Sequence, residues 1–168
     1  EDEEYKKYKD LGKDISKNFL KKHPDTFEAN YVAMWSSGLL NKQTDYMWKA
    51  YKINPDDPRL LDDLLINYEI NWEGAKRAEI AEKMVHNNYL ASGVMNCGYN
   101  VLSEVEQGGI IFSAGDNDTY ALWLNKYALD HRTDVTILNI HMMLLPEYRK
   151  KYFDKLGVPA IADVRHHV

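Results

Sequence analysis

The sequence predicts a mainly α protein with one small α/β unit towards its C-terminal end. Over residues 1–107, apolar side chains recur at spacings of three and four, the period of helices with one apolar face. Over residues 108–168, short β-branched and aromatic runs flank a helical pattern, which is typical of a strand–helix–strand unit. We therefore expect a helical domain over 1–107 and a β-α-β unit followed by a C-terminal helix over 108–168.

The composition is that of a mildly acidic globular protein. The chain has 168 residues, of which 45% are hydrophobic, and its formal net charge is -5. Nucleic-acid-binding domains usually carry a basic surface, so nucleic acid is not an expected partner. No stretch approaches the roughly 20 apolar residues that a membrane-spanning helix needs. The single cysteine, Cys97, excludes an internal disulfide, and its place on an apolar stripe predicts a buried thiol.

Six helices are expected in the first domain. The first ends before Pro24, and its apolar face consists of Tyr5, Tyr8, Leu11, Ile15 and Phe19. The next are expected over about 26–38, 43–53, 60–68, 73–86 and 89–106. Two prolines in residues 54–58 suit the end of one helix and the first turn of the next.

A similar helix junction occurs twice in this region. His23-Pro24-Asp25 and Asn54-Pro55-Asp56 each precede a helix and lie 31 residues apart. Tetratricopeptide repeats have a period of about 34 residues and pack as helix pairs, and residues 49–65 resemble a boundary between such repeats. The rest of the repeat pattern is poor. Two interpretations are therefore open, tetratricopeptide-like hairpins and an irregular helical bundle.

The pattern changes at residues 107–109. Residues 110–113 are a short apolar run bounded by turn residues, and 134–140 (DVTILNI) are rich in β-branched residues, so both are predicted to be strands. A helical pattern over 118–129 joins them, and the order predicts a right-handed β-α-β unit. Two strands are marginally stable alone. The tail near 160–164, a partner chain or a continuation of the sequence is expected to complete the sheet.

The loop that follows the first strand is the candidate binding site. Ligands of α/β units bind outside the carboxyl ends of the strands, where this loop lies and where the second strand also ends. Arg132 precedes the second strand and is expected at the opposite edge. The candidate ligand-binding residues are Asp116, Asn117, Asp118, Thr119, Asn139 and His141.

The charges of the loop indicate the type of ligand. Backbone N–H groups at a helix start favour an anion, but the carboxylates of Asp116 and Asp118 oppose one. A divalent cation held by these two residues, a hydroxyl-rich sugar or a metal-bridged phosphate suits the charges better. Sugar-nucleotide glycosyltransferases hold a metal with the same Asp-x-Asp pattern. The alternative is structural: Gly115 allows a tight turn, and Asn117 or Asp118 caps the following helix.

Several stretches carry a resemblance to a known family, namely residues 109–120 (GIIFSAGDNDTY), 122–123, 132–135 and 138–139. Together they resemble the soluble segment of bacterial membrane proteins described as protein O-mannosyltransferase-like, and of related tetratricopeptide-repeat proteins. Residues 147–150 and 155–159 resemble the stretch that follows. The sequence departs from the family at Ala121, where proline is common, and it contains no membrane region. The resemblance implies a bacterial protein module with a periplasmic or otherwise extracytoplasmic location. The sugar transfer belongs to the family's membrane part and is not implied for this segment.

The functional prediction follows from what the motifs contain and lack. No glycine-rich phosphate motif, zinc-ligand spacing or nucleophile elbow is present, so a non-enzymatic role is favoured. The leading prediction is a helical-repeat interaction or scaffold module that binds a protein or peptide partner. The alternative is a carbohydrate-related, glycosyltransferase-associated domain that binds a metal or sugar at the GDND loop. In a third interpretation, the β-α-β unit only seals the end of the helical array.

Overall fold

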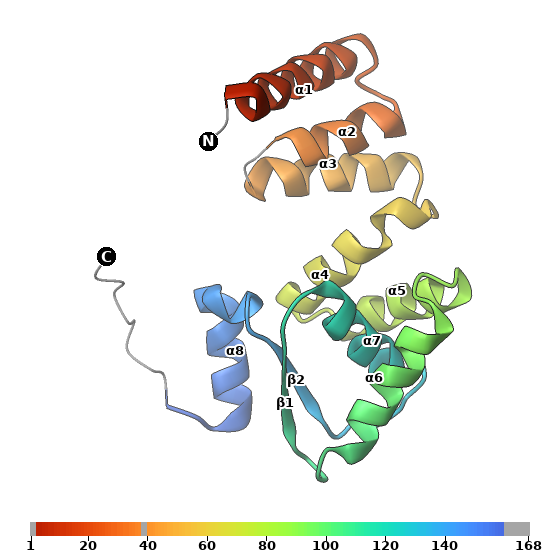
Figure 1. Ribbon diagram of the computed structural model, residues 1–168, viewed down its shortest axis with the longest axis vertical. Helices are drawn as coiled ribbons and strands as arrows, with labels where there is room; N and C mark the ends of the chain where they lie inside the picture. The colour runs from red at the N-terminus through yellow and green to blue at the C-terminus, as the bar shows by residue number, and fades with distance from the viewer. Residues whose placement is uncertain (1–2, 38–39, 160–168) are drawn as a thin grey trace. The chain divides into compact units, whose positions relative to one another are not determined.

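A computed structural model describes residues 3–37 and 40–159 (Figure 1). Within these ranges the chain forms helices α1 (Glu3–Lys22), α2 (Phe27–Ser36), α3 (Leu40–Ile53), α4 (Leu61–Asn71), α5 (Gly74–His86), α6 (Ser92–Glu104), α7 (Asp116–Tyr127) and α8 (Pro146–Leu156). It also forms strands β1 (Ile110–Ser113) and β2 (Thr136–Asn139) and the short 3-10 helices η1 (Pro58–Leu60) and η2 (Met142–Leu144). The predicted fold class, mainly α with a small α/β unit, is confirmed. The chain divides into two compact units between Asp63 and Leu64.

The first unit is held together by packing around α2. Thr26 caps α2 by accepting a hydrogen bond from the backbone N–H of Ala29 at 3.4 Å. Asn30 Nδ2 donates to the carbonyl oxygens of Pro24 and Thr26, each at 2.8 Å, which fixes the turn between α1 and α2. The buried apolar side chains of α2, α3 and η1 are Phe27, Ala29, Ala33, Met34, Met47, Ala50 and Leu60.

The apolar face predicted for α1 is present, but four of its five side chains are exposed and only Phe19 is partly buried. Tyr5, Tyr8, Leu11 and Ile15 retain 57%, 60%, 51% and 59% of their accessible surface. Ser16 is the one buried residue of this helix. Within the described part of the first unit, most of this face is therefore open to solvent.

The second unit contains a two-stranded parallel sheet. The register pairs Ile110 with Thr136 and Ser113 with Asn139, so the two strands end at the same edge. β1 has the predicted bounds, whereas β2 is shorter than the predicted run of 134–140, and α6 begins at Ser92 rather than at 89. Asn88 has a φ of 51°, a left-handed conformation that interrupts the helical path before α6.

Helices α7 and α8 lie on opposite faces of this sheet (Figure 1). Successive side chains of a strand point to opposite faces. Asn139 of β2 donates from Nδ2 to Thr119 Oγ1 of α7 at 2.8 Å. Its neighbour Leu138 packs with Tyr148 and Tyr152 of α8. One face of β2 therefore belongs to α7 and the other to α8.

The outer edge of β1 has no strand beside it among the described residues. On the face away from α7, Ile110 is 44% exposed and Phe112 is 66% exposed. The predicted third strand near 160–164 lies outside the described residues, and its other expected sources remain predictions.

A buried carboxylate connects four helices of the second unit. Glu69 of α4 is fully buried and accepts hydrogen bonds from Arg77 Nη1 of α5 and from the hydroxyl of Tyr127 at the end of α7. The hydroxyls of Tyr148 and Tyr152 on α8 donate to its other oxygen. Burial raises the pKa of all three tyrosines above the ordinary value, and the charge of Glu69 raises each further. The phenols therefore stay protonated and keep donating.

The Arg132-Thr133-Asp134 motif has a structural explanation. Arg132 precedes β2, as expected, and its guanidinium pairs with Asp134, with Nε 2.9 Å from Oδ1. Asp134 also accepts from the backbone N–H of Gly108 at 2.8 Å. The hydrogen bonds from Arg132 and Gly108 hold the pKa of Asp134 well below its ordinary value. The same guanidinium also donates to three carbonyl oxygens at the end of α6, those of Leu102 in its last turn and of Val105 and Glu106 just after it.

Candidate functional site

The turn from β1 into α7 depends on Gly115. Its φ of 85° lies in the left-handed region, which glycine adopts without steric strain, as the sequence indicated. Gly115 is the N-cap of α7, and the helix begins at Asp116 with no side-chain cap. The expectation that Asn117 or Asp118 caps the helix is therefore wrong, because both lie within its first turn.

Two of the predicted ligand residues form an internal network behind the loop. Thr119 Oγ1 donates to the carbonyl of Gly115 at 2.7 Å and accepts from Asn139 Nδ2. Ser113 Oγ lies 2.9 Å from Thr119 Oγ1, and Ser113 is the donor because the Thr119 proton is already used. Asn139 Oδ1 accepts from the backbone N–H groups of His141 and Met142 at 2.9 and 3.0 Å. These groups join the two strand ends, α7 and η2, and their hydrogen bonds are directed at the protein.

The structure divides the six predicted residues between two cavities. Asp116, Thr119, Asn139 and His141 line one cavity, whereas Asn117 and Asp118 line another. Residues two apart on a helix do not face each other, so Asp116 and Asp118 are not brought together. Among the described residues, no three or more His, Cys, Asp or Glu side chains gather as a metal site.

The first cavity has a volume of about 200 Å³ and lies at the carboxyl end of the strands. Besides the predicted residues, it is lined by Ile66, Tyr120, Trp123 and Met142. Trp123 is 1% exposed, and its buried indole Nε1 has no hydrogen-bond partner among the described residues. An unsatisfied buried donor costs about 1–3 kcal/mol. Trp123 lines the cavity, but Nε1 itself is shielded from solvent, so this donor is a cost to the fold and not an open contact for a ligand.

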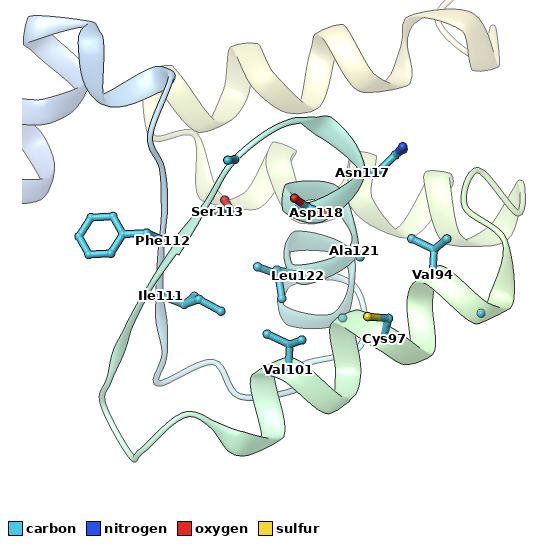
Figure 2. A pocket seen from close by; sticks show the side chains of 13 residues that line it. Val94, Cys97, Val101, Ile111, Phe112, Ser113, Asn117, Asp118, Ala121 and Leu122 are labelled. Carbon is cyan, nitrogen blue, oxygen red and sulfur yellow. The ribbon is translucent and has the colours of Figure 1, made fainter.

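The second cavity is an open groove of about 610 Å³ between α6, β1 and α7 (Figure 2). Figure 2 shows Val101, Ile111 and Leu122 directed into it from three elements, while Phe112 points away. Cys97 also lines the groove and is exposed. The predicted buried thiol is therefore wrong. The groove lies beside the outer edge of β1, where no further strand is described to fill the space next to α6.

Sequence reasoning missed a third cavity, which has a volume of about 240 Å³ and contains three cationic side chains, Arg77, Lys126 and Lys155. These residues lie on α5, α7 and α8 and are far apart in the sequence. No local pattern links them, so only the folded chain reveals the group.

A comparison with protein families matches residues 94–155 to TMEM260-associated domain 2. The matched range runs from α6 into α8 and so contains β1, α7 and β2. It covers rather more than a third of the chain. The name refers to a membrane protein family described as protein O-mannosyltransferase-like, which agrees with the resemblance at that level. No curated protein and no solved structure matches the chain. Among the described helices, none has the length and apolar character needed to cross a membrane.

Proposed function

We propose that the chain is a non-catalytic, extracytoplasmic interaction module that binds a protein or peptide partner through its helical part. The observation that carries the proposal is the exposed apolar face of α1, formed by Tyr5, Tyr8, Leu11 and Ile15. Contiguous exposed apolar patches are rare on monomeric proteins and mark interaction surfaces. The helix pairs of tetratricopeptide-like arrays typically present such surfaces to partners. The match to a domain of a membrane protein family and the resemblance to bacterial membrane proteins support the location.

Peptides selected from a displayed library against the chain are expected to lose at least about tenfold in affinity for a Tyr8→Ser, Leu11→Ser variant, as measured by calorimetry. Both side chains are more than half exposed, so their removal takes apolar contact area from a partner and little from the fold. A Lys6→Ser, Lys17→Ser variant changes the opposite side of the same helix and should retain the affinity. Selected peptides that bind the apolar-face variant as tightly as the original chain would contradict the proposal.

A second function is favoured by the cavity at the GDND loop, which brings the side chains of Asp116 and His141 together. In this second role, the cavity lined by Asp116, Trp123 and His141 binds one ring of a sugar ligand, with or without a divalent cation. One sugar hydroxyl can donate to the Asp116 carboxylate, and another can form a hydrogen bond with the imidazole of His141. This role would make the chain a carbohydrate-related, glycosyltransferase-associated domain.

A thermal-shift titration with Mg²⁺, Mn²⁺ and Ca²⁺, each with and without a panel of nucleotide sugars, tests the second function. A ligand at 100 times its dissociation constant stabilises the protein by about 2.7 kcal/mol, which raises Tm visibly. The rise is expected to disappear in Asp116→Ala and to persist in Asp118→Ala, because these carboxylates line different cavities. A rise that is absent for every combination, or equal in both variants, would exclude sugar or metal binding at Asp116.

A further inference from the structure

The cavity of about 240 Å³ lies at the opposite end of α7 from the GDND loop. Arg77, Lys126 and Lys155 line it from three different helices. Trp72 and Thr133 also line it, so the three cationic side chains share a small space with an aromatic ring and a hydroxyl.

One of the three positive charges is neutralised inside the protein. Arg77 pairs with the buried Glu69, and its guanidinium lies 4.0 Å from the ring centre of Tyr127. Burial opposes the charge of Arg77, but its interactions with Tyr127 and Glu69 outweigh burial and raise the pKa of Arg77. Glu69 already accepts four hydrogen bonds, three of them from tyrosines. The single negative charge of Glu69 therefore balances the positive charge of Arg77 and no other.

The other two positive charges have no carboxylate partner in the part of the chain that the structure describes. Lys126 Nζ donates to the carbonyl oxygen of Val135, a neutral acceptor. Lys155 Nζ lies 5.7 Å from the ring centre of Trp72 and 5.8 Å from that of Tyr152, and no described carboxylate pairs with it. Asp134 also acts on Lys126 through its charge, but it is bound to Arg132.

The local potential at Lys126 is accordingly positive. Burial and the positive charges of Lys155 and Arg77 together lower the pKa of Lys126 to about 8, although the charges of Glu69 and Asp134 act in the opposite direction. Like charges held close together are costly unless an anion lies between them. Two uncompensated cations in one cavity match the two negative charges of a phosphate group.

We propose that this cavity binds the phosphate group of a small phosphate monoester through Lys126 and Lys155. Arg77 retains guanidinium N–H groups beyond the one bonded to Glu69, and these can reach the same anion. Trp72, which is 37% exposed, offers an aromatic surface on which the organic part of the monoester stacks. The site is distinct from the sugar or metal cavity at the other end of α7.

Calorimetric titration at pH 7 and constant ionic strength tests the proposal with two probes, inorganic phosphate and phenyl phosphate. Both are expected to bind saturably to the full chain, with phenyl phosphate tighter. Lys155→Met is expected to weaken binding at least about tenfold, the usual scale for one lost charge-assisted contact. Because Lys155 is exposed, the Lys155→Met variant should fold normally. It can therefore test the site even if the Lys126→Met variant is too unstable to be measured.

The control is Lys150→Met on the same helix, because Lys150 pairs with Asp154 and does not line the cavity. It should retain the binding. Trp72→Ala should remove the advantage of phenyl phosphate over inorganic phosphate. The proposal is overturned if neither probe binds saturably, if chloride at equal ionic strength gives the same response, or if Lys150→Met weakens binding as much as Lys155→Met.

Discussion

Replacing Glu69 with alanine is expected to lower the free energy of unfolding by about 3–5 kcal/mol, the usual cost of removing one partner from a buried ion pair. The change leaves the half-buried Arg77 without its counter-ion, with 20% of its side chain exposed. It also removes the acceptor for the hydroxyls of Tyr127, Tyr148 and Tyr152. Because these groups come from α5, α7 and α8, all three helices lose their common contact with α4.

Urea unfolding followed by circular dichroism measures this change. The matched control is Glu73→Ala, at the residue before α5, whose side chain makes no capping hydrogen bond. Glu73 pairs with Lys76 at the surface, with 39% of its side chain exposed, so its loss should cost less than about 1 kcal/mol. Equal midpoints for the two variants would mean that the buried carboxylate does not hold the four helices together.

Replacing Gly98 with valine is expected to destabilise the protein by about 1–3 kcal/mol, the usual cost of overpacking. A Cβ atom at this position would lie 2.8 Å from the backbone carbonyl of Ala121. Helices α6 and α7 therefore approach each other where only a hydrogen atom fits, and a side chain must push them apart. The β-branched side chain is a strict test because it cannot rotate both methyl groups away from α7.

Gly93→Val on the same helix is the control, because a Cβ atom there meets nothing within 4 Å. Its effect on thermal unfolding should stay within about 0.5 kcal/mol. If the two valines shift Tm equally, helix propensity rather than close packing sets the cost.

The sequence predicted those parts of the fold that local patterns encode. The β-branched run of β2, the apolar run of β1 and the helical period between them identify the α/β unit, and Gly115 identifies the turn. Periodicity also identified the apolar faces of α1 and α6. It could not tell that these faces are exposed, because spacing alone does not reveal what packs against a helix.

The candidate site was predicted less completely. Placing Asp116 and Asn139 at the same edge requires only parallel strands, and the register agrees. The inward hydrogen bonds of Thr119 and Asn139 depend on side-chain directions that residue types do not specify. The Glu69 cluster was missed for another reason. Its partners extend as far as Tyr152, and only tertiary packing brings such distant residues together.

The opposite placement of α7 and α8 determines where this sheet can grow. Crossovers between parallel strands are almost always right-handed. Since α7 leads from β1 to β2 on one face and α8 leaves β2 on the other, a parallel strand following α8 has to return past β2 and lie beside β1. The open groove between α6 and β1 borders that position. The strand order then reverses at β1, which makes Gly115 and the first turn of α7 a topological switch point, the place where doubly wound sheets bind their ligands.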